Sequence, residues 1–290
     1  MTPFKKILFP TDFSPNADKA LAHAVRLADF EDGEVIVQHV IGDYFDRHPH
    51  WATLFDVRGL HKSVDGYVAA HMEKILPRDA GAVRIRTVIS KGKPAEEIAA
   101  LADREMVDLV VMGSAKGVIT NKVLRMTNRP VLAVSANQPN FGEMGLHKTT
   151  RILVATDFSN HSKRVVQYAF DLKRIFDARI YLLYVIETGR AIEWAIRQGH
   201  LLHGMDKMRE WAGNQLLNLV PDEFVKDPTV FRLVEAGTPG DTIAKVASEM
   251  GADLTILGTH EYGAIHKHLL GTTTDRLLTK ITTPLLAVKL

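Results

Sequence analysis

Two stretches of the sequence, KKILFPTDFS at residues 5–14 and TRILVATDFS at residues 150–159, are near copies of each other. Each is a short apolar run that ends in Thr-Asp-Phe-Ser, a pattern typical of a buried strand that turns into a capped helix. The same offset of 145 residues relates further pairs along the chain, namely Gly92 and Gly237, Pro94 and Pro239, Ile98 and Ile243, Asp108 and Asp253, and Gly113 and Gly258. A register kept over so many residues predicts a duplicated domain.

The junction between the two copies is polar and rich in Asn, Gly and Pro, as expected of a linker. We therefore expect one domain over residues 1–136, a linker over 137–148 and a second domain over 149–290.

Composition limits the classes of protein to which this chain can belong. Of its 290 residues, 46% are hydrophobic and 24% are charged, and the net charge is +2. These values predict two hydrophobic cores of ordinary size. They also predict no strong electrostatic field that would attract nucleic acid or a lipid surface. The absence of cysteine excludes disulfides, thiolate catalysis and cysteine-ligated metal sites. Since the longest apolar runs are far shorter than about 18 residues, we expect no membrane span and a cytoplasmic protein.

Apolar runs alternate with segments of helical periodicity in each copy. In the second copy the expected strands are 151–156, 179–186, 229–235, 253–258 and 284–289, and the expected helices are 160–176, 203–220, 241–250 and part of 259–281. This alternation predicts two tandem α/β domains, each a doubly wound, five-stranded parallel sheet of Rossmann-like type. Ligands of such sheets bind beyond the carboxyl ends of the strands at the switch point, so the segments after strands one and four are the candidates.

The segment after the first strand of the second copy holds Asp157. Its carboxylate could accept hydrogen bonds from ribose hydroxyls or hold Mg²⁺, or it could simply cap the following helix together with Ser159. The segment after the fourth strand holds Gly258 and then Gly271, followed by Thr272, Thr273 and Thr274. Hydroxyls at a helix N-terminus favour an anion site, although a solvated loop before a Thr-capped helix has the same pattern.

The first copy is shorter in this same region. Pro130 pairs with Pro284 at an offset of 154 residues, so nine residues after Gly113 are missing from the first copy. The missing residues belong to the loop that, in the second copy, leads to Gly271 and its threonines. Neither copy contains a G-x-x-x-x-G-K-[ST] or a G-x-G-x-x-G motif. We therefore expect an anion site in the second copy and not in the first.

Together these motifs resemble the universal stress protein family, twice over and across essentially the whole chain. The resemblance rests on K-I-L-x-x-T-D-F-S, on Val-Ile at the end of the second strand, and on G-x-P-x-x-x-I, D-L-x-x-x-G and P-x-L-A-V. It implies two domains of the adenine nucleotide alpha hydrolase-like fold. Members of the family that bind ATP carry G-x2-G-x9-G-[S/T] after the fourth strand. The second copy matches with Gly258, Gly271 and Thr272, but it has Glu261 in place of the second glycine.

The resemblance also implies how a nucleotide would lie in the second copy. Ala155, Thr156 and Asp157 would contact the nucleoside, with Asp157 near the ribose, and the backbone of Val185 would face adenine. The phosphates and ribose would be held within the set Gly258, His260, Gly271, Thr272, Thr273 and Thr274. Glu261 adds a negative charge there. Its repulsion of the phosphates could weaken their binding by on the order of 1 kcal/mol or more at an effective dielectric near 20.

The resemblance predicts a stress-response regulator whose second domain binds ATP, with or without Mg²⁺. It also predicts a protein partner, which the sequence does not identify. With no evident general base or activated nucleophile, it would be at most a slow ATPase. The first copy would pack against the second as a pseudo-dimer, and homodimers are also compatible with the family. One alternative is a nucleotide-independent interaction scaffold, and another is a zinc-binding variant that uses His260, His266 and His268.

Overall fold

The computed structural model describes residues 4–29, 32–42, 57–75, 83–114, 118–135, 149–159, 162–189, 202–259 and 272–289. The chain folds into two compact units, one essentially Met1–Gly142 and the other Glu143–Val288. Each unit has its own strands, its own helices and its own cavity.

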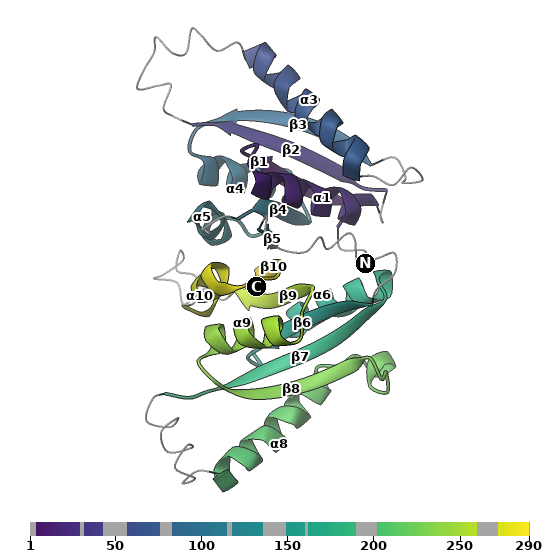
Figure 1. The fold of residues 1–290 in the computed structure, drawn as a ribbon, viewed down its shortest axis with the longest axis vertical. Helices are drawn as coiled ribbons and strands as arrows, with labels where there is room; N and C mark the ends of the chain where they lie inside the picture. Colours follow the sequence, from purple (N-terminus) through teal and green to yellow (C-terminus); the bar gives the residue numbers. More distant parts are fainter. Residues whose placement is uncertain are drawn as a thin grey trace. The chain divides into compact units, whose positions relative to one another are not determined.

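The first unit alternates strands and helices along the chain (Figure 1). Its elements are β1 (Lys6–Thr11), α1 (Pro15–Asp29), β2 (Glu34–Ile41), α3 (Val57–Ile75), β3 (Arg84–Lys91), α4 (Pro94–Arg104), β4 (Leu109–Gly113), α5 (Val118–Met126) and β5 (Val131–Val134). Its strands run in the order β3-β2-β1-β4-β5, and all four adjacent pairs are parallel.

The second unit repeats this order of elements. They are β6 (Thr150–Thr156), α6 (Ser162–Ile175), β7 (Ala178–Glu187), α8 (Leu202–Asn218), the short 3-10 helix η3 (Asp222–Phe224), β8 (Val230–Gly237), α9 (Pro239–Glu249), β9 (Leu254–Thr259), α10 (Thr272–Lys280) and β10 (Leu285–Lys289). The strand order is β8-β7-β6-β9-β10, and β6 pairs in parallel with both β7 and β9. The predicted fold class is therefore confirmed, with the switch point between the first and fourth strands of each unit.

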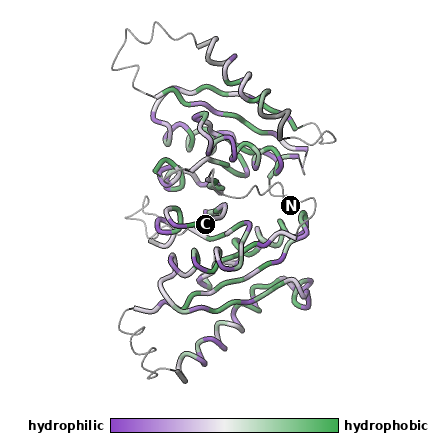
Figure 2. The backbone as a smooth tube through the Cα atoms, in the orientation of Figure 1, coloured by the Kyte–Doolittle hydropathy of each residue, from purple (hydrophilic) through white to green (hydrophobic). Residues whose placement is uncertain are grey.

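The strands at the switch point are apolar on both faces, which is why the sequence reads as short continuous runs. Every residue of β1 after Lys6 is buried, and β4 and β9 are buried along most of their length. Figure 2 shows these strands as predominantly hydrophobic tubes. Burial on both faces is the rule for parallel sheets covered by helices. The edge strand β8 differs, since most of its residues are partly or fully exposed.

The G-x-P motif ends the third strand of each unit. Gly92 and Gly237 have φ angles of 147° and 153°, which side chains rarely adopt. A Cβ on Gly237 would lie 2.5 Å from Thr242 Oγ1. The proline two residues later occupies the first turn of α4 or α9, where its missing N–H costs no hydrogen bond. The motif therefore encodes a sharp entry from strand three into the next helix.

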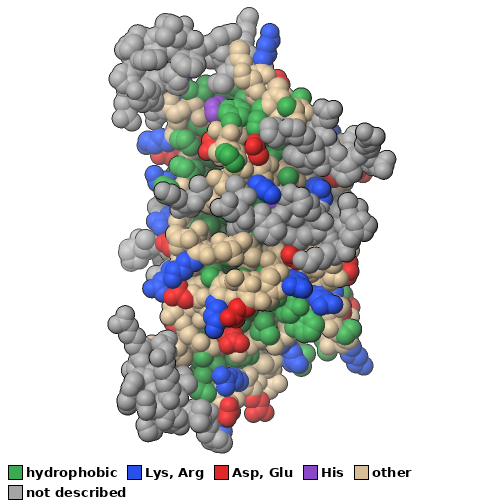
Figure 3. All heavy atoms as spheres, viewed as in Figure 1, with side chains coloured by type: hydrophobic (Ala, Val, Ile, Leu, Met, Phe, Trp, Pro, Cys, Tyr) green, Lys and Arg blue, Asp and Glu red, His purple; other side chains and the backbone are tan. Residues whose placement is uncertain are grey.

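None of the helices within the described ranges is long and apolar enough to cross a membrane. The face of the molecule in Figure 3 carries Lys and Arg interspersed with Asp and Glu, as the small net charge of +2 would suggest.

Candidate functional site

The turn between β6 and α6 is held by the side chains of its own motif. Phe158 has a φ of 61°, which places it in the left-handed region. The Phe158 amide donates to Thr156 Oγ1 at 3.3 Å, and the Ser159 amide donates to Asp157 Oδ1 at 3.0 Å. Ser162 Oγ, in the first turn of α6, donates to the same Asp157 oxygen at 2.8 Å. Asp157 therefore holds the turn that leads into the helix, through the Ser159 amide and the Ser162 hydroxyl.

The equivalent turn of the first unit has the same geometry. Phe13 also has a φ of 61°, its amide donates to Thr11 Oγ1 at 3.0 Å, and the Ser14 amide donates to Asp12 Oδ1 at 3.0 Å. The Thr-Asp-Phe-Ser motif thus specifies a turn in both units. Any difference in ligand binding between the units must arise from other residues.

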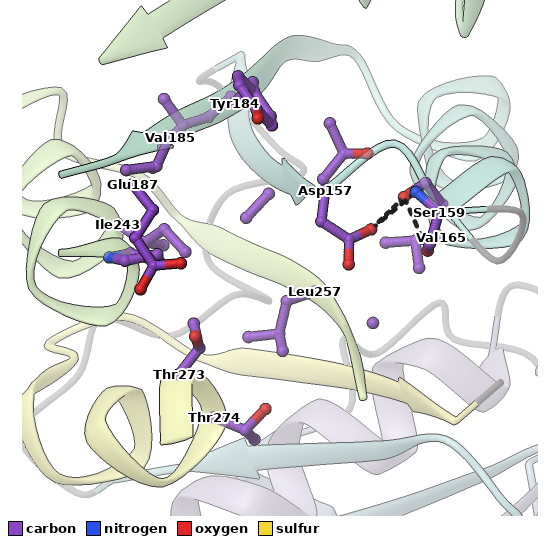
Figure 4. A pocket seen from close by; sticks show the side chains of 16 residues that line it. Asp157, Ser159, Val165, Tyr184, Val185, Glu187, Ile243, Leu257, Thr273 and Thr274 are labelled. Carbon is purple, nitrogen blue, oxygen red and sulfur yellow. Dashed lines mark hydrogen bonds between the residues drawn. The ribbon is translucent and has the colours of Figure 1, made fainter. Parts of the chain in front are cut away.

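A cavity of about 280 Å³ opens at the switch point of the second unit. It lies against the carboxyl ends of β6, β7 and β9 and the first turns of α9 and α10 (Figure 4). It brings together most of the residues predicted for the site, namely Ala155, Thr156, Asp157, Val185, Gly258, Thr273 and Thr274. Thr272 is the first residue of α10. His260 and Gly271, together with Glu261, His266 and His268, lie outside the described residues.

Side chains that the sequence does not single out for the site also line this cavity. They are Ser162 and Val165 of α6, Leu183, Tyr184 and Glu187 of β7, Pro239 and Ile243 of α9, and Leu257 of β9, with Ser159 from the turn. Tyr184 also packs, since its ring stacks on Phe158 at 4.3 Å between centroids, and Trp211 meets Phe158 edge-on at 5.4 Å. Tyr184 lies beside the cavity because the register of β6 with β7 places it opposite Thr156.

The charged groups of the described lining are both carboxylates. Asp157 and Glu187 lie on opposite sides of the view in Figure 4. Burial raises the pKa of the Tyr184 phenol, and the negative charges of Asp157 and Glu187 raise it further. Positive potential at this end of the sheet comes from the N-terminus of α10, whose first N–H groups have no partner within the helix. An anion is therefore favoured at the threonines, and hydroxyl or N–H donors are favoured near the carboxylates.

The glycine that ends strand four has a packing role in the first unit. A Cβ on Gly113 would lie 2.6 Å from the carbonyl carbon of Asn16 and 2.7 Å from the amide nitrogen of Ala17. Its hydrogen side chain is what allows α1 to lie against β4. The sequence interpretation gave the equivalent Gly258 a role in ligand approach, and α6 contacts β9 in the second unit as α1 contacts β4.

The predicted zinc ligands cannot be placed, since His260, His266 and His268 fall outside the described ranges. Within those ranges, no three His, Asp or Glu side chains are grouped closely enough to hold a metal ion.

Comparison with known proteins follows the same division into two copies. The chain matches the universal stress protein family twice, over residues 3–135 and 148–289. A universal stress protein of Methanocaldococcus jannaschii is 34% identical over 154 residues, which cover 45% of this chain and 94% of that protein. A universal stress protein structure from Archaeoglobus fulgidus covers 98% of each chain with a TM-score of 0.68 and 20% identity. One from Pseudomonas aeruginosa covers 99% of this chain and 94% of its own, with a TM-score of 0.61 and 14% identity.

Proposed function

This chain belongs to the universal stress protein family, and from that premise we propose that its second unit binds an adenine nucleotide and acts as a nucleotide-dependent regulator in the stress response. The observation that carries the proposal is the cavity at the switch point of the second unit. It joins the turn after β6 to the threonines that begin α10. ATP, with or without Mg²⁺, is the nucleotide we propose.

The base and ribose would occupy the end of the cavity formed by β6 and β7. Val185 is 8% exposed and lines the cavity, so a base beside it would lie against the backbone of β7. Asp157 Oδ1 accepts two hydrogen bonds from the turn. The carboxylate also lines the cavity, so a ribose hydroxyl placed there would donate to it.

The phosphates would lie at the first turn of α10. Thr273 lines the cavity, and Thr274 does so while only 2% exposed. Exposed N–H groups at a helix N-terminus, together with hydroxyl donors, form a ready anion site. If Mg²⁺ accompanies the nucleotide, Asp157 and Glu187 offer the carboxylate oxygens that this ion prefers, and the ion would neutralise phosphate charge.

The described lining offers little chemistry beyond binding. It contains no His, Lys or Arg side chain, so proton transfer to a leaving group would depend on other residues or on water. We therefore propose a nucleotide-dependent switch that hydrolyses its nucleotide slowly at most.

A nucleotide-independent interaction scaffold is the second candidate function. The observation that favours it is the pair of carboxylates, Asp157 and Glu187, in a cavity whose described lining has no basic side chain. Glu261 is a further acidic residue, in the segment of sequence after the fourth strand. Within the described lining, repulsion between these two carboxylates and a triphosphate would be relieved by a bound cation or by the N-terminus of α10.

Equilibrium binding of labelled ATP separates the two candidates. We expect the wild type to bind one ATP per chain, and Gly271→Glu to abolish binding by adding bulk and charge beside the phosphates. Thr273→Ile, which introduces the residue found at the equivalent position of the first copy, should weaken binding about tenfold through loss of one hydroxyl donor to a charged group. The matched control, Ile119→Thr in the first unit, should leave the affinity for ATP unchanged. Negligible binding by all four proteins, with or without Mg²⁺, would favour the scaffold.

A further inference from the structure

One side of the second unit's cavity combines an apolar wall with a carboxylate. Val185 and Glu187 of β7 and Ile243 of α9 lie on one side of the view in Figure 4, and Asp157 lies on the other. Val185 and Ile243 are 8% and 4% exposed, so they form a buried apolar wall. Within the described lining, Glu187 is the charged group of this side.

The fold places this carboxylate where β7 ends against α9. Side chains alternate between the two faces of a strand, so Glu187, the last residue of β7, shares a face with Val185. Helix α9 packs against β7. The register pairs Glu187 with Gly237, and Pro239 then begins α9 and lines the cavity. The Glu187 carboxylate therefore stands at the margin of the apolar wall that β7 and α9 form.

The Glu187 carboxylate is accessible to a ligand in the cavity. Glu187 is exposed, and it belongs to the lining. Within the part of the chain that the structure describes, no hydrogen bond or ion pair engages its side chain. The first copy has Gly42 at the equivalent position, which has no side chain to offer. The carboxylate is thus a feature of the second copy that its packing does not use.

A purine nucleotide in the pose proposed above turns its C6 edge toward Glu187. The sugar of a purine nucleotide is bonded to N9, and the substituent at C6 lies on the far side of the ring system from N9. With the ribose beside Asp157 and the base beside Val185, this substituent extends away from Asp157, toward the side of the cavity that holds Glu187. The inference rests on the proposed function, because it takes this pose as its premise.

We propose that Glu187 selects adenine by accepting a hydrogen bond from the exocyclic amine at C6. The amine of adenine is a donor, and an ionised carboxylate can only accept. Guanine carries a carbonyl oxygen at C6, which is also an acceptor, so it would face the carboxylate with no hydrogen between them. Glu187 therefore gives the second unit a preference for 6-amino purines over 6-oxo purines.

ATP and purine riboside triphosphate form a matched pair of probes, since they differ only in the amino group at C6. Titration calorimetry on the full chain should show that ATP binds at least about tenfold more tightly, the ratio expected for a hydrogen bond to a charged acceptor. GTP should also bind more weakly than ATP. Equal affinities for ATP and purine riboside triphosphate would overturn the role of Glu187 and leave the nucleotide site standing. No binding of either would refute the proposed function, and this inference with it.

Two variants assign the preference to this carboxylate. Glu187→Ala should weaken ATP at least about fivefold, with no loss of affinity for purine riboside triphosphate. The matched control is Glu235→Ala, since Glu235 is exposed on β8 opposite Val185 and is not part of the described lining. It should leave both affinities unchanged, and circular dichroism would check that each variant is folded.

Repeating the titrations with and without Mg²⁺ separates recognition of the base from binding of a cation. The ratio of the two affinities in the wild type should be the same in both conditions. A preference for ATP that persists in Glu187→Ala would show that another group recognises the amine. An equal loss for both probes, seen only with Mg²⁺, would show that Glu187 serves the cation. Either result would contradict the proposal.

Discussion

His23 is a titratable side chain inside α1, with only 1% of its surface exposed. Burial, together with the positive charges of Lys19 and Arg26, lowers its pKa from 6.5 to about 3. The folded chain therefore keeps this imidazole neutral. In the unfolded chain the ring takes up a proton as the pH falls through 6.5. The unfolded state binds more protons over this interval, so folding stability must decrease as the pH falls from about 6.5 toward about 3.

Replacing His23 with leucine should remove this dependence. One proton bound only by the unfolded state contributes up to about 1.4 kcal/mol per pH unit to the free energy of unfolding. Urea unfolding of wild type and His23→Leu, measured at intervals from about pH 7 to about pH 5, should show the free energy of unfolding of the wild type falling relative to that of the variant as the pH falls. Parallel curves would mean that His23 can be protonated in the folded state.

The paired aspartates show what the sequence could and could not reveal about single residues. The repeat identified Asp108 and Asp253 as equivalent, without a reason for their identity. In the structure, Asp108 Oδ2 accepts from the Lys6 amide and Asp253 Oδ2 accepts from the Arg151 amide, both at 2.8 Å. Each carboxylate ties the start of strand four to the start of strand one. The partner of each lies 102 residues away in sequence, which no local pattern discloses.

At the scale of elements, the apolar runs located the strands well because buried parallel strands are apolar on both faces. The strand expected at 151–156 is Thr150–Thr156, and the helix expected at 203–220 is Leu202–Asn218. The packing of one element against another was harder to predict from the sequence. The approach of α1 to β4 depends on Gly113, whereas the sequence interpretation of this glycine position concerned a ligand.

Gly113→Ala tests the contact between α1 and β4. The added methyl group would lie within 3 Å of backbone atoms of Asn16 and Ala17, which cannot withdraw as a flexible side chain can. We expect a loss of about 1–3 kcal/mol in the free energy of unfolding of the first unit. The matched control is Gly213→Ala within α8, where a Cβ would meet nothing within 4 Å. That variant should be neutral or more stable by about 0.5–1 kcal/mol, and equal effects of the two substitutions would refute the packing role.

At the scale of the whole molecule, the repeat was sufficient to predict two domains of one fold class. It also predicted that the site follows strands one and four of the second domain. The remaining lining could not be predicted, because it converges from three strands and three helices whose register and crossing are set by tertiary packing. Tyr184 is an example, since the pairing of β6 with β7 sets it opposite Thr156, the residue before Asp157.

The central claim is that nucleotide binds in one of the two copies. Hydrogen exchange of the full chain, followed by mass spectrometry with and without saturating ATP, tests it most directly. We predict slower exchange in the turn over 156–159 and in the first turn of α10, and unchanged exchange at 11–14 and in the first turn of α5. Protection in the first unit instead, or none in either unit, would contradict the account.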